Sequence, residues 1–193
     1  MVEAAYRLMS ARGYIDTTIA DIAAEAGVAV QTVYFTFHNK PGVLRAAFEF
    51  AVTGDHRPGG PAEREWFVAL RQERDAERAL VILVDATAEI FRRIVPLASV
   101  FQVLGDDPEI DSFSRLNRRL TRDGYRLVID NLARKRPLRP GLSHDDATTI
   151  LLVLLGSDVY RSMLEDHGWT EQKWRSWVIE TLLEALFGHD TTG

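Results

Sequence analysis

Apolar positions recur along this chain at the three- and four-residue spacing of amphipathic helices, and no stretch alternates as a strand would. Glycine and proline divide this pattern into segments. The sequence therefore predicts an all-α protein. We expect short helices up to Gly13, over 19–26, over 30–35 and from Asn39 to about Val52. Later helical segments are expected around Trp66 and over 76–93, 112–134, 143–166 and 170–187.

Capping signals mark several of these ends. Thr18 and Asp21 have the spacing of a capping box, and Gly27 can end the helix that follows. Asn39 is a good amino-terminal cap for the helix that follows it. Pro41 lies in the first turn of that helix, where its missing amide costs nothing. Three stretches predict interruptions: the loop GDHRPGGP over 54–61, Val95-Pro96 after the helix from 76, and the turn DDPEID over 106–111.

The two short helices 19–26 and 30–35, joined by a tight turn at Gly27, predict a helix-turn-helix. Their spacing turns Val28, Val33 and Phe37 toward the neighbouring helices. The other side of the second helix then presents Gln31, Thr32, Tyr34 and Thr36 outward. Amides and hydroxyls of this kind suit base edges and phosphates, and no carboxylate occurs over 26–48. Lys40, beside a helix amino terminus, suits a phosphate.

Overall charge argues mildly against this interpretation. The chain has a formal net charge of −5, and residues 1–53 carry four basic side chains against five acidic ones. Nucleic-acid contact depends, however, on where charge lies rather than on its sum. A second basic stretch, Arg115, Arg119, Arg122 and Arg126, forms a stripe along one predicted helix. It could hold an anion or be a solvated face, and the second alternative is the simpler one.

Other chemistry has no visible pattern in the chain. Cysteine is absent, which excludes disulfides and thiolate nucleophiles and fits a cytoplasmic protein. The five histidines lack metal-ligand spacing, and no activated nucleophile or phosphate-cradling glycine loop occurs. No uninterrupted apolar run is longer than 150–155, which is too short to span a bilayer. We therefore expect no metal, no cofactor, no catalytic site and no membrane partner.

The last two predicted helices are apolar on more than one side. The run 150–155 is apolar around its whole circumference, and the final helix carries one apolar side at Trp174, Val178 and Leu182 and another at Ile179 and Leu183. A single packing partner cannot cover such helices, so two copies would form a four-helix interface in a homodimer. The helices over 76–166 supply large apolar side chains with few polar ones, which predicts a largely apolar ligand pocket. Its candidate lining is Phe91, Phe101, Val103, Phe113, Leu116, Leu120 and Leu155, with Gln102, Tyr125 and Asp158 as polar anchors.

The stretch TTIADIAAEAGVAVQTVYFTFHNK resembles the TetR family of transcriptional regulators. The matching positions are Thr17-Thr18, Ile22-Ala23, Ala26-Gly27-Val28, Thr32-Val33-Tyr34, Phe37 and Asn39-Lys40. Ala29, Gln31, Thr36 and Pro41-Gly42 depart from the residues usual in the family. These departures leave the fold prediction intact and make the operator sequence unreadable from the motif.

The resemblance implies a DNA-binding domain over 1–46 and an effector-binding and dimerisation domain over 47–193. It further implies a repressor of the TetR type, not an enzyme, that a small molecule releases from double-stranded DNA. No ligand-binding residue is assigned. Two alternatives stay open: a dimeric helical small-molecule-binding protein that has lost DNA binding and, more distantly, a helical enzyme. The residues expected to contact DNA are Thr18, Val30, Gln31, Thr32, Tyr34, Phe35, Thr36 and Lys40.

Overall fold

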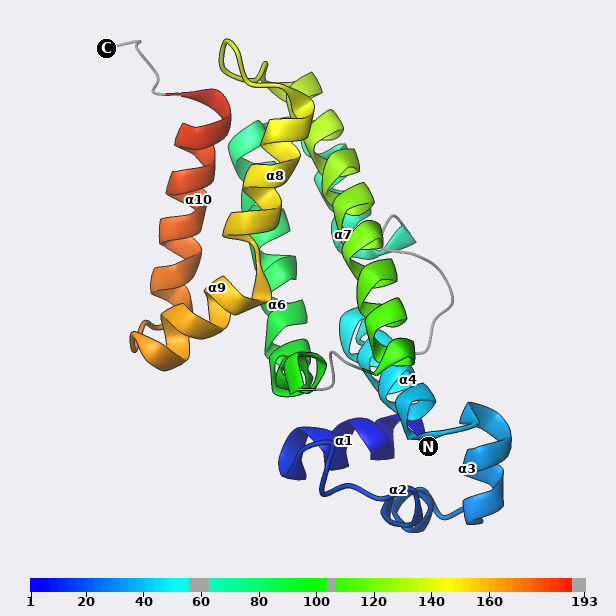
Figure 1. The fold of residues 1–193 in the computed structure, drawn as a ribbon. Coiled ribbons are helices and arrows are strands. Elements are labelled where there is room, and N and C mark those ends of the chain that lie inside the picture. The colour runs from blue at the N-terminus through cyan, green and yellow to red at the C-terminus, as the bar shows by residue number, and fades with distance from the viewer. Residues whose placement is uncertain (56–62, 104–106, 189–193) are drawn as a thin grey trace. The chain divides into compact units, whose positions relative to one another are not determined.

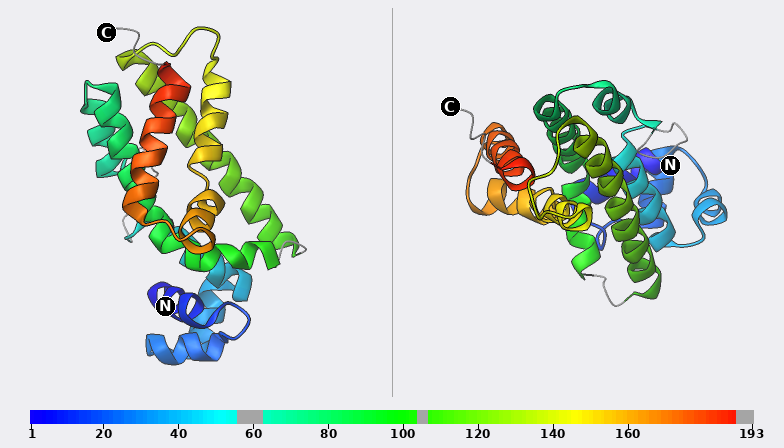
Figure 2. Two further views of the ribbon diagram at one scale, coloured as in Figure 1. Left: turned by 90° about the vertical axis from the view of Figure 1, so that its left-hand side faces the viewer. Right: turned by 90° about the horizontal axis from the view of Figure 1, so that it is seen from above.

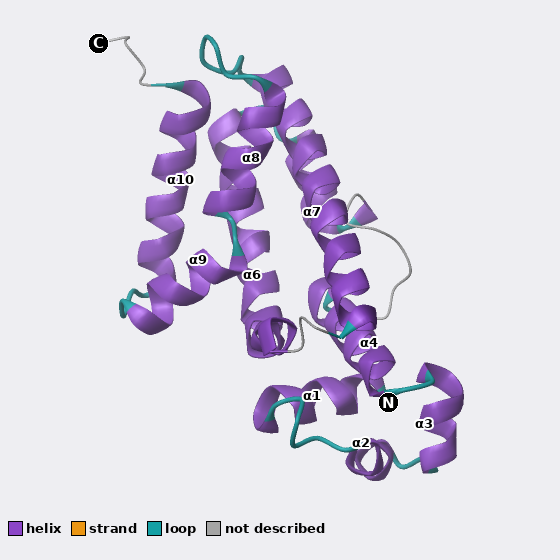
Figure 3. Ribbon diagram, viewed as in Figure 1, coloured by secondary structure: helices purple, strands orange, loops and turns teal. Residues whose placement is uncertain are grey.

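The computed structural model describes residues 1–55, 63–103 and 107–188, and every regular element in these ranges is a helix (Figures 1 and 3). The all-α prediction is confirmed over this part of the chain. The residues form two compact units: unit 1 comprises 1–57 and 90–117, and unit 2 comprises 58–89 and 118–193. Most of the predicted loop 54–61 lies outside the described residues.

Unit 1 begins with α1 (Val2–Arg12), α2 (Ile19–Ala26), α3 (Val30–Phe37) and α4 (Lys40–Thr53) (Figure 2). The helix-turn-helix prediction is confirmed, since α2 and α3 are short helices joined by a tight turn. α3 extends two residues beyond the predicted 30–35. Buried apolar side chains from all four helices form the core, including Ala5, Met9, Ile22, Val33 and Leu44.

Local signals account for the start and end of α2. The Thr18 hydroxyl accepts from the Asp21 amide at 3.1 Å, and the Asp21 carboxylate accepts from the Thr18 amide at 2.9 Å. This is the predicted capping box, which satisfies amides that a helix start leaves unpaired. Gly27 has a left-handed backbone, with φ 66°, and so turns the chain toward α3 at little steric cost.

A tight turn joins α3 to α4. His38 has φ 67° and ψ −44°, and the Asn39 amide donates to the Phe37 carbonyl at 2.8 Å, which makes this a γ-turn. The Asn39 side chain accepts from the Gly42 amide at 2.7 Å and caps α4. A Cβ atom on Gly42 would lie 2.1 Å from the Phe37 carbonyl oxygen. Position 42 therefore requires glycine for this close approach.

Unit 2 contains α5 (Glu65–Gln72) and the last part of the chain, and two long helices contribute to both units. These are α6 (Ala76–Val103) and α7 (Pro108–Lys135), of which 76–89 and 118–135 belong to unit 2. α8 (His144–Leu154), α9 (Ser157–Arg161), a π-helical turn (Ser162–Asp166) and α10 (Glu171–Phe187) complete it. α8 and α10 lie side by side (Figures 1 and 2).

The predicted interruption at Val95-Pro96 is wrong, because α6 continues through Pro96 to Val103. An internal proline removes one helical hydrogen bond and costs about 3 kcal/mol. Packing offsets this cost: Ile94 and Leu97, on either side of the proline, are both buried, as is Val100. Burial of a helix face thus outweighs the local preference of one residue.

α7 begins at Pro108, earlier than the predicted Ser112, so the stretch read as a turn is a helix start. The Asp107 carboxylate accepts from the amides of Glu109 at 2.9 Å and Ile110 at 3.2 Å. Proline then occupies the first helical position, and Ile110 is buried. The sequence DPEI therefore carries the cap signal that the turn interpretation overlooked.

The predicted helix 143–166 is interrupted at Leu155-Gly156, where Gly156 has an extended backbone with φ −84° and ψ 137°. The Tyr125 hydroxyl donates to the Leu155 carbonyl at 3.2 Å, which satisfies an acceptor near the break.

Among the described residues, His144–Asp166 is the one stretch with the length and composition of a membrane span, and 28% of its most apolar window is buried. Helices of globular proteins pass the same test, so this is weak evidence for a membrane.

Candidate nucleic-acid interface and effector domain

α3 presents the predicted contact residues on its outer side. Val33 is fully buried against the rest of unit 1, whereas Gln31, Thr32 and Thr36 are exposed. Large side chains are exposed as well: Phe35 at 86%, Tyr34 at 50% and Val30 at 36%. The Thr36 hydroxyl donates to the Thr32 carbonyl at 2.9 Å. The outward face of α3 is therefore a mixture of amide, hydroxyl, aromatic and aliphatic groups.

Thr18 and Lys40 are both engaged within the protein. The Thr18 hydroxyl donates to the Asp21 carboxylate at 2.7 Å as part of the α2 cap. The Lys40 ammonium donates to the Ile15 carbonyl at 3.1 Å and lies 4.3 Å from the centre of the Tyr14 ring. Burial lowers the pKa of Lys40 from its usual value. A phosphate contact by Lys40 would require it to share or leave these partners, and that role stays a prediction.

Residues at the start of α7 reach the residues around α4's amino terminus. The Asn39 amide group donates to the Glu109 carboxylate at 2.8 Å, while its oxygen caps α4. The pKa of Tyr14 is raised, first by burial and then by the negative charges of Asp107 and Glu109. The contact between Asn39 and Glu109 was not predicted from the sequence, because 70 residues separate the two partners.

The carboxyl end of α4 is held by α6. The Arg93 guanidinium donates to the Ala51 carbonyl at 2.7 Å and to the Val52 carbonyl at 3.5 Å. The Tyr6 hydroxyl of α1 in turn donates to the Arg93 carbonyl at 3.1 Å. Free carbonyls at a helix end attract a cation, both through hydrogen bonds and through the helix dipole. Arg93 thus fixes the end of α4 to α6 and α1.

An edge-to-face aromatic pair completes the attachment of α4. The ring centres of Phe48 on α4 and Phe113 on α7 are 5.7 Å apart. Within unit 1, α4 is therefore held at its start, middle and end by side chains of α6 and α7.

The interior of unit 2 contains a polar group among apolar neighbours. The Tyr125 hydroxyl of α7 donates to the Leu155 carbonyl. It also shares a hydrogen bond with the Thr87 side chain of α6. Burial raises the pKa of Tyr125 far above its usual value, an effect that the Thr87 hydrogen bond partly offsets. Thr87 is 5% exposed. Tyr125 is thus a half-buried phenol at the meeting of α6, α7 and α8.

The predicted lining of an effector pocket is only partly placed inside. Phe91 and Leu155 are buried, but Leu116 at 50% and Leu120 at 57% are exposed, so these two do not line an interior site. Asp158 is exposed as well. The error arose because α7 carries leucines on its solvent side, beside arginines. The side chains of Phe101, Gln102 and Val103 lie outside the described residues.

The arginine stripe of α7 faces outward. Arg115 pairs with Asp111, and Arg126 pairs with Asp130, at 3.1 Å, and with Asp145. Arg119 and Arg122 are exposed. The stripe is therefore a solvated face with acidic neighbours, in agreement with the simpler of its two interpretations.

An ion-pair cluster in unit 2 was not anticipated from the sequence. Arg175 of α10 pairs with Glu171 at 2.8 Å, with Asp85 of α6, and at 4.0 Å with Glu89. Tyr160 donates to the same Glu171 at 2.8 Å. The one-turn spacing of Asp85 and Glu89 was visible in the sequence, but the partner arginine lies 90 residues further on. The cluster joins α6, α9 and α10.

The two apolar sides of α10 behave differently. Trp174, Val178 and Leu182 are fully buried in unit 2, whereas Ile179 and Leu183 are half-buried. On the neighbouring α8, Leu152 is half-buried and Val153 is 59% exposed. Apolar side chains thus remain partly uncovered on both helices of the predicted dimer interface.

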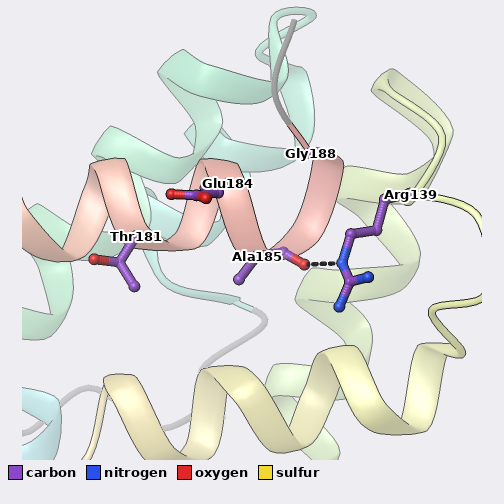
Figure 4. Close-up of a pocket in the computed structure, with 5 residues that line it drawn as sticks. All are labelled: Arg139, Thr181, Glu184, Ala185 and Gly188. Atoms are coloured by element: carbon purple, nitrogen blue, oxygen red, sulfur yellow. Dashed lines mark hydrogen bonds between the residues drawn. The ribbon is translucent and has the colours of Figure 1, made fainter.

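A pocket of about 440 Å³ lies at the carboxyl end of α10 (Figure 4). The Arg139 guanidinium donates to the Ala185 carbonyl at 2.8 Å, and the Arg139 amide donates to the Leu186 carbonyl at 2.8 Å. Arg139 therefore serves chiefly to satisfy the last carbonyls of α10. The pocket is lined by Arg139, Thr181, Glu184, Ala185 and Gly188.

A helix-turn-helix whose second helix presents an exposed outer face is a DNA-binding motif. Residues 1–47 match the family model described as bacterial regulatory proteins, tetR family. This match confirms the resemblance to the TetR family seen in the sequence. No curated protein sequence gives a significant match.

Solved structures share the fold over nearly the whole chain. The regulator FadR from Bacillus subtilis, in complex with stearoyl-CoA, has a TM-score of 0.71 at 19% identity, covering 96% of this chain and 97% of that one. A TetR-family regulator from Rhodococcus sp. has a TM-score of 0.70 at 13% identity, covering 96% and 95%. A regulator from Saccharomonospora viridis, in complex with choline, has a TM-score of 0.66 at 20% identity, covering 95% and 93%.

Proposed function

We propose that the protein is a homodimeric transcriptional repressor of the TetR type that acts in the cytoplasm and leaves its operator when a small molecule binds unit 2. The observation that carries the DNA-binding part is the outward face of α3, where the expected contact residues are exposed together. No carboxylate occurs over 26–48 to repel the DNA backbone. The DNA contacts are Val30, Gln31, Thr32, Tyr34, Phe35 and Thr36 on α3, with Thr18 and Lys40 beside it.

Dimerisation follows from the uncovered apolar side chains of α8 and α10. Val153 on α8, together with Ile179 and Leu183 on α10, would be covered by the same helices of a second copy in a four-helix interface. The modest burial of His144–Asp166 has the same explanation, because an interface helix is exposed in a single chain. A dimer also supplies the two recognition helices that a twofold operator needs.

The effector site is best sought around Tyr125. The hydroxyl of the half-buried Tyr125, with the buried Thr87, offers a polar anchor beside the apolar core of unit 2, which is the composition of sites for largely apolar ligands. Two regulators of the same fold were solved with stearoyl-CoA and with choline, so the fold accommodates small molecules of differing polarity. Apolar chains with one polar end are the first compounds to test.

Effector binding would reach DNA through α4. α6 and α7 are continuous helices that contribute to both units, and in unit 1 they hold α4 at Asn39, Phe48 and Ala51. A ligand that shifts either helix therefore acts on the helix next to α3. The ligand needs only to prefer the DNA-incompetent state, with a coupling on the order of 1 to 3 kcal/mol.

Few basic side chains are available for DNA contact, and this observation favours the alternative of a helical ligand-binding protein that does not bind DNA. Four basic residues stand against five acidic ones over 1–53, and Arg7 pairs with Glu25 at 2.9 Å. A helical ligand-binding protein without DNA affinity would show the same charge. The two functions differ in one respect: only the regulator prefers particular duplexes.

The test uses the full chain with duplex fragments from the promoter region of its own gene and a scrambled fragment of equal composition. We expect preferential binding of one fragment with a shallow salt dependence, since few phosphate contacts release few counterions. Compounds that raise the melting temperature should release that fragment, because one binding energy serves both effects. Ligand binding without preference for any duplex would favour the alternative, and turnover of a compound would favour an enzyme.

A further inference from the structure

The outer face of α3 contains an unusually exposed aromatic side chain. Phe35 is 86% exposed, and Tyr34 and Val30 beside it are 50% and 36% exposed. Burial of an aromatic ring removes a large apolar area from water, so a phenylalanine left this exposed on a binding helix gains most when a ligand covers it. The occupant has to be apolar where it meets Phe35.

The rest of α3 limits which bases it can read. All of Val30–Phe37 is described, and it contains no arginine, lysine, asparagine, aspartate or glutamate. Arginine and lysine are the usual readers of guanine, and acidic side chains accept from cytosine. Gln31 can pair with adenine through two hydrogen bonds, whereas apolar groups recognise the 5-methyl group of thymine. The helix is therefore equipped for A·T pairs.

Gln31 and Phe35 lie on the same part of this face. They are four residues apart, so their side chains are neighbours about 5 to 6 Å apart along the helix. Successive base pairs are about 3.4 Å apart along the DNA axis, so the two side chains can reach adjacent or next-adjacent pairs. Thr32 and Thr36 repeat the same spacing, and the Thr36 hydroxyl already donates to the Thr32 carbonyl.

We propose that α3 reads A·T pairs in the major groove, with Phe35 packed on the 5-methyl group of a thymine and Gln31 bound to a nearby adenine; this rests on the proposed DNA-binding function. The thymine methyl is the apolar group that the major groove offers, and it stands beside the polar edges that Gln31 and Thr32 need. Specificity for the operator then depends on apolar contact more than on charge.

The experiment begins with selection of duplexes from a random library by the full-length dimer. Each thymine of the selected half-site is then replaced by deoxyuridine, which removes only the 5-methyl group. We expect weaker binding by about fourfold at one position per half-site, the value of one buried methylene-sized group, and about sixteenfold when both half-sites are changed.

Variants assign the effect to its residue. Phe35→Ala should bind thymine and uracil operators equally, whereas Phe35→Leu should keep part of the discrimination. Gln31→Ala is the matched control: it should keep the methyl effect and lose preference at the neighbouring adenine. Since both side chains are exposed, the variants should keep the melting temperature and the dimer.

The outcomes separate the two proposals. Selected half-sites rich in G·C, or an unchanged thymine-to-uracil ratio in Phe35→Ala, would overturn the methyl contact and leave the regulator function standing. A folded dimer that selects no duplex would overturn both.

Discussion

α3 and the α8–α10 pair both expose apolar side chains, but their surroundings differ. On α3, Phe35 and Tyr34 stand among amides and hydroxyls in a stretch without carboxylates. On α10, Ile179 and Leu183 are half-buried beside the acidic Glu180 and Glu184. An acidic border repels the DNA backbone, whereas the rim of a protein interface accommodates charged side chains because they remain in water. The neighbours of an apolar patch, rather than its apolar area, therefore indicate its partner.

The largest expected effect comes from placing a charge on the α8–α10 side. Leu183→Arg should convert the dimer to monomer, because the buried charge would lack a partner. Operator affinity should then fall by about 100-fold or more, since the second half-site no longer acts at high effective concentration. Sedimentation and fragment binding measure the two effects.

Leu120→Arg is the matched control for that substitution. Leu120 is 57% exposed on α7, outside the proposed interface, and its variant should stay dimeric with unchanged affinity. If Leu120→Arg dissociates the dimer and Leu183→Arg does not, the interface lies on α7. Leu182 is unsuitable as a probe, because it is fully buried within the chain.

A second substitution tests the turn that sets the direction of α3. Gly42→Ala places a Cβ atom 2.1 Å from the Phe37 carbonyl oxygen and should destabilise the protein by about 1 to 3 kcal/mol. For a chain of this size, each kcal/mol lowers the melting temperature by about 2 to 4 °C. His38→Gly, which relieves a positive φ, should instead leave stability unchanged or raise it. An unchanged melting temperature in Gly42→Ala would show that the turn can open without cost.

The attachment of α4 should contribute less to stability and more to the effector response. Arg93→Ala removes hydrogen bonds from a charged group to two carbonyls, and we expect a loss of about 1 to 2 kcal/mol. Glu109→Ala removes the contact with Asn39, which can still cap α4. Both variants should bind DNA yet release it less completely at saturating effector. Full release by both would exclude these contacts from the coupling.

The smallest effect concerns acid stability in unit 2. Hydrogen bonds from His144 and Arg126 hold the pKa of Asp130 below its usual value of 3.8. A depressed carboxyl pKa in the folded state means that this stabilisation is present above the unfolded pKa and is lost as pH falls through the folded one. At pH 7 the Asp130→Asn variant should therefore have a lower melting temperature than the original chain. This difference in melting temperature should shrink below about pH 4. A constant difference down to pH 2 would contradict the assignment.

Much of unit 1 could be predicted from the sequence because its signals are local. The capping box of Thr18, the left-handed Gly27 and the exposed side of α3 all depend on residues within one or two turns of each other. The course of α6 through Pro96 could not be predicted in this way, since burial of Leu97 and Val100 outweighs the proline's cost. The start of α7 also carries a local signal, because Asp107 caps the amides of Glu109 and Ile110 and Pro108 occupies the first helical position.

Contacts between segments far apart in the chain could not be predicted from the sequence pattern. Asn39 with Glu109 and Arg175 with Asp85 join residues 70 and 90 positions apart, and no spacing rule identifies such partners. The prediction that Leu116 and Leu120 line a pocket was wrong for a related reason. Leucines at helical spacing mark an apolar side of a helix, but the spacing does not show whether that side faces the core or solvent. Which side is buried depends on the neighbouring helices, and the sequence does not specify their placement.

Pro96 also bears on how α6 should exchange its amide protons with solvent. Because proline has no amide proton, Pro96 cannot donate to the carbonyl four residues earlier in the helix, and the helical hydrogen-bond ladder is interrupted there. The Tyr6 hydroxyl donates to the next carbonyl, that of Arg93, beside this gap. Local opening tends to stop where such a ladder is interrupted. The amides after Pro96 should therefore exchange as a group at their own rate, separate from those between Ala79 and Ile94, and Tyr6→Phe should accelerate the group nearest the gap.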